Sequence, residues 1–112
     1  MKKIIAVIRP EKLDDVRQAL DELGCPGMMI EDIRGHGRQK GIELEWRVGT
    51  YKVDLLPKVK IQIVAKEEKV EPIIGAIVKS AATGEVGDGK IFIQSVEETV
   101  RIRTGERGEQ AL

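Results

Sequence analysis

Residues 58–96 read KVKIQIVAKEEKVEPIIGAIVKSAATGEVGDGKIFIQSV, and this stretch decides the fold. Apolar and polar side chains alternate over residues 59–63, which predicts a half-buried strand. Apolar residues then recur at helical spacing over residues 70–81, and the compact run at residues 91–96 is typical of another strand. The order is therefore strand, helix, glycine-rich turn, strand.

The first part of the chain has the same order. Residues 4–8 form a short, mostly β-branched run that predicts a buried strand. Pro10 suits the first turn of a helix, and Gly24 is a typical residue for its end. Residues 28–34 read as a second strand. Two such units predict an α+β, ferredoxin-like βαββαβ sandwich, formed as a single domain over residues 1–112.

The two faces of this sheet should differ. Both helices would cover one face, whereas the other would carry Ile and Val from all the predicted strands. No segment is left over to cover that second face, and large uncovered apolar faces are rare in monomers. We therefore expect copies of the chain to associate through their sheets.

A long connection, at about residues 36–57, separates the two halves. Connections of this length without secondary structure are uncommon in compact domains and are usually functional or disordered. This one holds Trp46 and Tyr51, the only Trp and Tyr of the chain. Exposing both is unfavourable unless a partner covers them, so this protruding loop is a candidate partner-binding surface. The alternative is that both side chains fold back onto the core.

Composition narrows the class of function. The 19 basic and 19 acidic side chains cancel, which disfavours nucleic-acid binding through overall charge. The single cysteine, Cys25, cannot form an internal disulfide and suits the reducing cytoplasm. The apolar run at residues 4–8 is too short to span a membrane. We therefore expect a cytoplasmic protein.

The glycine-rich turn resembles part of a phosphate-binding loop. Gly84, Gly89 and Lys90 match its spacing, but Ile91 stands where that motif needs a Ser or Thr for magnesium. A standard phosphate loop also precedes a helix, whereas this turn precedes a predicted strand. The match to the standard loop is therefore a coincidence. The backbone N–H groups of a glycine turn can still bind phosphate when a cation lies nearby.

Several cations could join such a site. Arg101 and Arg103 would project to one side of an extended C-terminal segment at about residues 97–112. Arg38 and Lys58 flank the long connection. Arginine presents a fork that suits phosphate oxygens. Each of these residues could equally be a solvated surface charge, because spacing alone does not bring them together.

Along nearly its whole length the chain resembles the nitrogen-regulatory PII signal transduction proteins. The segments that carry the resemblance are RPEKLDDVRQAL, GHGRQKG, LPKVKIQIV, TGEVGDGKIFI and RIRTGE. The combination of TxxxGDGKIF with RIRTG downstream is specific. The resemblance implies a homotrimer of ferredoxin-like subunits whose sheets face inward, with ATP or ADP bound in the clefts between subunits.

The resemblance also implies which residues bind the nucleotide. By similarity, the phosphates would be held by Gly87, Asp88, Gly89, Lys90, Arg38, Arg101 and Arg103, with Ile102 in the same set. Val7, Met29, Gln62 and Val64 would line the adenine pocket. Gln62 stands where relatives often have Glu, and Met29 stands where Thr is frequent, so nucleotide preference could differ.

With ATP and Mg²⁺ present, the family binds 2-oxoglutarate at the root of the long loop. By similarity that site comprises Lys58 together with Gly37, Arg38, Gln39, Lys40 and Gly41. Gln39 would help to coordinate Mg²⁺ beside oxygens of ATP and 2-oxoglutarate, and Lys58 would pair with a carboxylate. Metal and ligand binding would then be interdependent.

The long loop of the family reports the bound ligands to partners. In many relatives an arginine matching Arg47 enters and blocks an ammonium-transporter pore, and nitrogen-metabolism enzymes are further possible targets. Trp46, Arg47 and Tyr51 are therefore the candidate partner-binding residues, and membrane recruitment would be reversible and only through the transporter. A tyrosine matching Tyr51 is uridylylated in some bacterial members, although the context WRVGTY departs from the usual one.

Two other functions stay open. A slow ATP-hydrolysing enzyme is the first, but no carboxylate is clearly placed as a base near the glycine turn. An RNA-binding module is the second, because the ferredoxin-like fold hosts many, but Phe92 is the only aromatic residue in a predicted strand. We favour a non-enzymatic sensor of ATP, ADP and 2-oxoglutarate.

Overall fold

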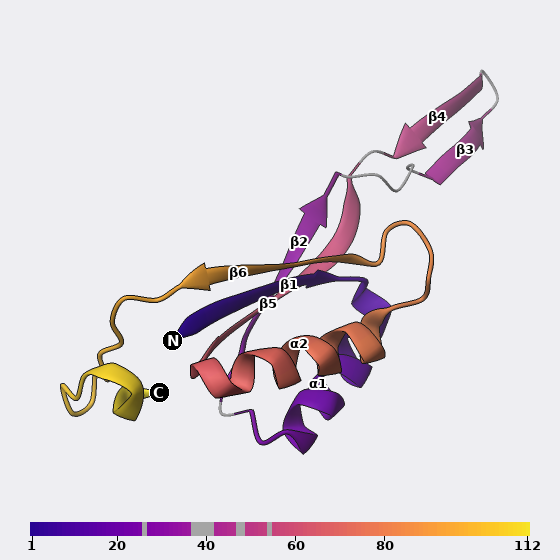
Figure 1. The fold of residues 1–112 in the computed structure, drawn as a ribbon. Helices are drawn as coiled ribbons and strands as arrows, with labels where there is room; N and C mark the ends of the chain where they lie inside the picture. The colour runs from indigo at the N-terminus through magenta and orange to yellow at the C-terminus, as the bar shows by residue number, and fades with distance from the viewer. Residues whose placement is uncertain (26, 37–41, 47–48, 54) are drawn as a thin grey trace.

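The computed structural model describes residues 1–25, 27–36, 42–46, 49–53 and 55–112. Four antiparallel strands form its main sheet, in the order β2-β5-β1-β6, and two helices lie together on one side of it (Figure 1). The elements are β1 (Lys2–Ile8), α1 (Leu13–Glu22), β2 (Met29–Gly35), β5 (Leu56–Ala65), α2 (Glu67–Ala81) and β6 (Gly89–Ser95). This order and pairing are those of a ferredoxin-like sandwich, so the predicted α+β fold is confirmed.

The core lies between the helices and one face of the sheet. From Ile4 to Ile8 on β1 and from Val59 to Ala65 on β5 every second residue is buried against the helices, as the alternation on β5 predicted. The most buried members are Ile4, Ala6, Ile8, Val16, Leu20, Val59, Ile61, Ile63, Ile73 and Ile77. Full burial of a Val, Leu or Ile side chain contributes about 1.5–3 kcal/mol, so this layer is the main source of stability. Among the described residues, no helix is both long and apolar enough to cross a membrane.

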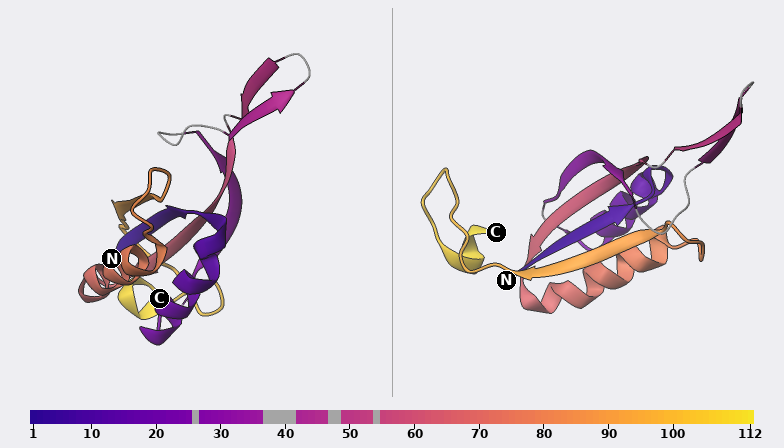
Figure 2. Two further views of the ribbon diagram at one scale, coloured as in Figure 1. Left: turned by 90° about the vertical axis from the view of Figure 1, so that its right-hand side faces the viewer. Right: turned by 90° about the horizontal axis from the view of Figure 1, so that it is seen from above.

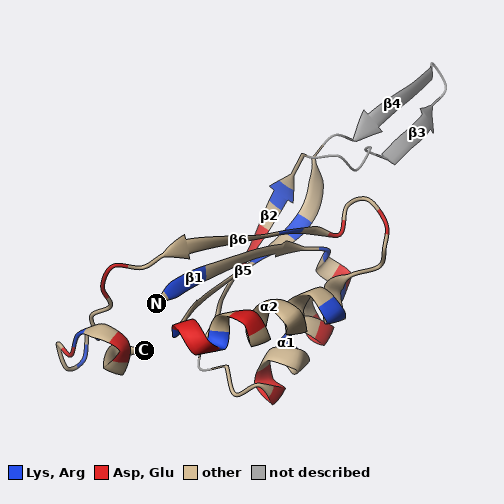
Figure 3. Ribbon diagram, viewed as in Figure 1, with Lys and Arg blue, Asp and Glu red and all other residues tan. Residues whose placement is uncertain are grey.

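The opposite face of the sheet is more polar than we expected. The strand pairing places Val7 between Lys60 and Lys90, and Lys60 forms an ion pair with Glu31 of β2 at 3.5 Å. Figure 3 marks basic positions on β1, β2 and β5, and the register places Lys58 and Lys60 of β5 on this face, whereas Arg34 of β2 alternates to the other one. The expectation of Ile and Val from every strand is therefore wrong for β6, which places Lys90, Phe92 and Gln94 on this face, because its two isoleucines alternate to the helix side. Both helices lie on the other side, and no described segment of the same chain covers this face (Figure 2).

The long connection contains a two-stranded sheet. Strand β3 (Ile42–Trp46) pairs antiparallel with β4 (Gly49–Val53), and this hairpin lies beyond the ends of β2 and β5 (Figure 1). Strand β5 also begins earlier than expected, at Leu56. The secondary structure in this connection therefore differs from the structureless loop that the sequence suggested.

The C-terminal segment is not extended, which corrects the expectation for residues 97–112. The N–H of Gly105 donates to the carbonyl of Arg101 at 2.7 Å, and Val100 forms a β-bridge with Arg107. A short 3₁₀ helix follows at Gly108–Ala111. Gly105 has a φ of +74°, a conformation that glycine adopts without steric cost, so the chain reverses here.

Candidate functional site

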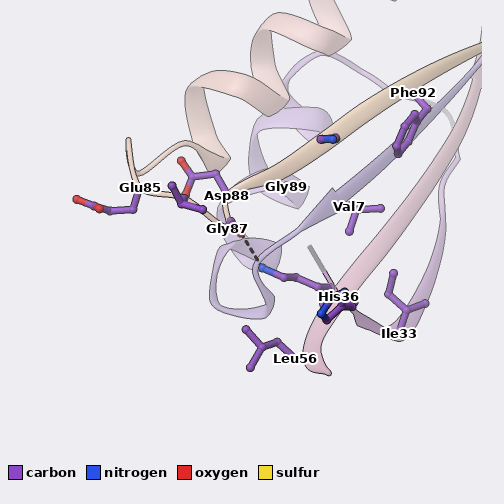
Figure 4. A pocket seen from close by; sticks show the side chains of 13 residues that line it. Val7, Ile33, His36, Leu56, Glu85, Gly87, Asp88, Gly89 and Phe92 are labelled. Atoms are coloured by element: carbon purple, nitrogen blue, oxygen red, sulfur yellow. Dashed lines mark hydrogen bonds between the residues drawn. The ribbon is translucent and has the colours of Figure 1, made fainter. Parts of the chain in front are cut away.

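A cavity of about 590 Å³ opens on the face of the sheet away from the helices. Its walls come from the ends of β1, β2 and β5, the turn at residues 83–88 and the start of β6 (Figure 4). The lining residues are Val7, Ile33, Gly35, His36, Leu56, Lys58, Glu85, Val86, Gly87, Asp88, Gly89, Lys90 and Phe92. The cavity therefore combines an apolar wall with two lysines and a glycine-rich backbone, which suits a ligand with an apolar part and an anionic part.

The glycine-rich turn joins α2 to β6, so the order of helix, turn and strand is as predicted. Gly87 and Gly89 both have a φ of +104°. A Cβ on Gly89 would lie 1.7 Å from the carbonyl oxygen of Val7, so only glycine allows the turn to approach β1 this closely. A turn of this kind can present backbone N–H groups to an anion.

Asp88 shapes the turn through its side chain. Its carboxylate accepts hydrogen bonds from the Thr83 N–H at 2.7 Å, the Gly84 N–H at 2.9 Å and the Thr83 hydroxyl. The Thr83 hydroxyl and amide, followed by the Arg9 guanidinium and the Gly84 amide, hold the pKa of Asp88 well below its usual range. The carboxylate therefore already has hydrogen-bond partners within the protein. At a phosphate site, Asp88 would contribute its backbone N–H.

Arg9 is a site residue that the sequence analysis missed. Its Nε lies 3.0 Å from Asp88 Oδ1, and its Nη2 donates to the carbonyl of Val86 at 2.9 Å. Only 15% of its side chain is exposed. The available signal was a lone arginine that follows a buried strand and precedes Pro10, but no local pattern connects it with a turn 79 residues away.

Lys58 approaches the turn from β5. Its Nζ donates to the carbonyl of Gly87 at 2.6 Å, the contact drawn as a dashed line in Figure 4. Burial, and after it the charge of Arg9, lowers the pKa of Lys58. A Cβ on Gly35 would lie 3.2 Å from Lys58 Cγ, so the absence of a side chain there leaves room for the lysine stem.

Known proteins resemble this chain along its whole length. The model of the family "Nitrogen regulatory protein P-II" matches residues 1–106. Nitrogen regulatory protein P-II 2 of Methanothermobacter thermautotrophicus is 55% identical over all of this chain and 97% of its own length. The P-II proteins of Pasteurella multocida and Haemophilus influenzae are each 53% identical over the full length of both chains.

The chain belongs to the P-II family. The matched range includes every residue that lines the cavity. This P-II protein is accordingly a member of a family of nitrogen regulatory proteins, as the resemblance predicted.

The structure brings one group of the predicted site residues together. Around the cavity lie Val7, Lys58, Gly87, Asp88, Gly89 and Lys90. Met29, Gln62 and Val64 lie outside the cavity lining, farther along the sheet, where Met29 is paired with Gln62. The amide of Gln62 donates to Glu31 at 3.2 Å. Their proposed contact with adenine stays a prediction.

A second group of predicted site residues lies beyond the C-terminal end of β6, away from the glycine-rich turn. Arg101, Ile102 and Arg103 follow the end of that strand, whereas the glycine-rich turn precedes its start (Figure 2). Arg101 is paired within its own segment, with Glu106 at 3.1 Å and the Gln110 carbonyl at 2.9 Å. Ile102 is fully exposed. Within one chain, these residues do not meet the turn.

The remaining predicted residues lie in the long connection. Gly37, Arg38, Gln39, Lys40, Gly41 and Arg47 fall outside the described residues. The backbone of Trp46 ends β3, and that of Tyr51 lies in β4 opposite Leu44. Their roles towards 2-oxoglutarate, Mg²⁺ or a partner stay predictions.

Proposed function

We propose that this P-II protein is a non-enzymatic regulator that binds ATP or ADP, and with them 2-oxoglutarate, and signals to its targets through the long loop. The observation that carries the proposal is the cavity in which a glycine-rich turn, Lys58 and Lys90 meet an apolar wall. Nitrogen regulation as such follows from the family. The ligands and targets are the proposed part.

The chemistry of the cavity supports a nucleotide. Triphosphate oxygens suit the lysine ammonium groups and the backbone N–H groups of a turn with successive glycines. The side chains of Val7 and Phe92 offer apolar area beside this anionic end, as a base requires. Met29, Gln62 and Val64 would extend the surface for the base along the same sheet.

A neighbouring chain would complete the nucleotide site. Arg101, Ile102 and Arg103 lie beyond the end of β6 that is opposite to the turn of their own chain, so a second copy would supply them. The uncovered sheet face is available for such an association. The proposed assembly is a homotrimer with three equivalent sites, to which Arg38 would add a further cation.

The site for 2-oxoglutarate would adjoin the phosphates. Lys58 would pair with one carboxylate, and residues 37–41 would supply backbone donors. Among the described residues no cluster of three or more metal-ligating side chains occurs, and the carboxylate of Asp88 is already committed. Mg²⁺ would therefore be held mainly by oxygens of ATP and 2-oxoglutarate, with Gln39 as the protein ligand.

The proposed targets are an ammonium transporter and, alternatively, enzymes of nitrogen metabolism. Trp46, Arg47 and Tyr51 would form the contacting part of the loop, with Tyr51 as a possible modification site. The protein would work in the cytoplasm and reach the membrane only through the transporter. Nucleic acid is not a proposed partner, because Phe92 is the only aromatic side chain in the strands of the main sheet.

The geometry gives little support to hydrolysis. A general base must lie within hydrogen-bonding reach of the attacking water. Asp88 is engaged with Thr83, Gly84 and Arg9, and Glu85 points away from the centre of the cavity (Figure 4). We therefore assign no catalytic residue.

Capture from membranes of the source cell tests the function. The immobilised protein is incubated with detergent-solubilised membranes in ADP, in ATP with Mg²⁺, or in ATP with Mg²⁺ and 2-oxoglutarate. We expect an ammonium transporter to be retained with ADP and released when ATP and 2-oxoglutarate are both present. Lys58→Met should retain the transporter in all three conditions. If wild type retains the transporter equally in all three conditions, the sensor mechanism is refuted. ATP turnover well above about 1 per second would favour an enzyme.

A further inference from the structure

Two cationic side chains contact the glycine-rich turn. Arg9, just after β1, contacts both Asp88 and the carbonyl of Val86, at 3.0 and 2.9 Å. Lys58, on β5, contacts the carbonyl of Gly87 at 2.6 Å. Two successive peptide carbonyls of the turn, those of Val86 and Gly87, therefore accept hydrogen bonds from cationic side chains.

These contacts determine where the backbone donors of the turn point. A trans peptide unit is planar, so its N–H points opposite to its C=O. The hydrogen bond from Arg9 to the Val86 carbonyl turns the N–H of Gly87 away from Arg9. The bond from Lys58 to the Gly87 carbonyl likewise turns the N–H of Asp88 away from Lys58. The orientation of two successive donors is thus set before any ligand arrives.

Arg9 also controls the charge of the turn. The Asp88 carboxylate lies within the turn and would repel a phosphate group if it were free to turn outward. Its hydrogen bonds to Thr83 and Gly84 hold it inward, and the Arg9 guanidinium compensates its charge at 3.0 Å. The Arg9 side chain is only 15% exposed, so solvent screens this ion pair less than one at the surface.

We propose that Arg9 is a positioning residue for phosphate binding: it fixes the glycine-rich turn through Asp88 and Val86. This rests on the proposed function, in which the turn binds the phosphates of a nucleotide. Arg9 differs in kind from Lys90, which is proposed to pair with the phosphates directly. Its effect on affinity passes through Asp88 and the Val86 carbonyl, and this distinguishes positioning from direct contact.

A double-mutant cycle tests the proposal. ATP affinity is measured by calorimetry for wild type, Arg9→Met, Asp88→Asn and the double variant. We expect each single variant to bind ATP about 10- to 100-fold more weakly, since each loses hydrogen bonds to a charged group. The double variant should bind about as weakly as Arg9→Met alone, because Arg9→Met already removes the contacts to both Asp88 and Val86. Arg9→Lys should restore only part of the affinity, since one ammonium cannot reach both partners.

The control is Arg17→Met, on the exposed side of α1, which should leave ATP affinity unchanged. Affinity losses that multiply in the Arg9 and Asp88 double variant would overturn the proposal, as would unchanged binding by Arg9→Met. Hydrogen exchange on the nucleotide-free protein gives a second measurement. The amides of Thr83 and Gly84 should exchange faster in Arg9→Met while those of β1 stay protected.

The two measurements separate this inference from the proposed function. If wild type does not bind ATP, the proposed function fails and Arg9 has no phosphate site to position. If wild type binds ATP but the exchange of Thr83 and Gly84 does not respond to Arg9→Met, the clamp is absent and the inference alone fails. In a third outcome, Arg9→Met lowers the urea midpoint of unfolding and raises amide exchange in β1 as much as in the turn. Arg9 is then a general structural residue, and the inference also fails.

Discussion

Replacing Gly89 with alanine tests how closely the turn approaches β1. The new Cβ would lie 1.7 Å from the Val7 carbonyl oxygen and 2.8 Å from its carbon, at a φ of +104°. Placing an L-residue at such a φ costs about 1–2 kcal/mol. Overpacking against a neighbour that must move costs about 1–3 kcal/mol more. We therefore expect Gly89→Ala to lower the free energy of unfolding by about 2–5 kcal/mol.

Two other glycines provide matched controls. Gly84 lies in the same turn with a φ of +88°, but no atom lies within 4 Å of its added Cβ. Gly84→Ala should therefore cost only the strain, about 1–2 kcal/mol. Gly75 lies within α2 with open space around it, so alanine there should stabilise the protein by about 0.5–1 kcal/mol.

Urea unfolding followed by circular dichroism provides the assay, with all variants at one protein concentration because association shifts apparent stability. The difference between Gly89→Ala and Gly84→Ala isolates the close approach to Val7. If the two variants are destabilised equally, the contact between the turn and β1 is absent and the account of the turn is wrong.

The remaining predictions concern charge, core and ligand. Ionised Asp88 should stabilise the fold, and the difference in thermal midpoint between wild type and Asp88→Asn measures this effect. The difference should be complete at pH 7 and shrink as pH falls below about 4, because the folded-state pKa of Asp88 lies below the unfolded value of about 3.9. A difference that stays constant with pH would contradict this prediction. Ile61→Ala should lower the free energy of unfolding by about 2–5 kcal/mol, whereas Val78→Ala, at a 54% exposed position, should change it by less than about 0.5 kcal/mol. Lys58→Met should abolish 2-oxoglutarate binding in calorimetry with ATP and Mg²⁺, and retention of that binding would remove Lys58 from the site.

Alternation and helical spacing predicted the fold because the core has one simple requirement. Ile61 and Ile63 must face the helices, and a period of two encodes that in the sequence. The same period of two occurs in IELEW, at residues 42–46, where apolar and polar residues alternate, and this segment forms β3. Expecting a structureless connection there overlooked this signal.

The glycine-rich turn was predictable in its glycines but not in its side-chain partners. A run of Gly with a following Lys indicates an unusual backbone and a cation, which are local properties. The contact of Arg9 with Asp88 joins residues 79 positions apart, and only the folded sheet brings them together. The reversal at Gly105 was likewise missed, although a glycine after RIRT was a readable turn signal.

Calorimetric titration of ATP into the purified protein at physiological salt tests the central claim most directly. We expect saturable binding with one nucleotide per chain, and loss of that binding in Lys90→Ala with the fold intact. Absence of saturable heat up to millimolar ATP in the wild-type protein would contradict the assignment of the glycine-rich turn as a nucleotide site.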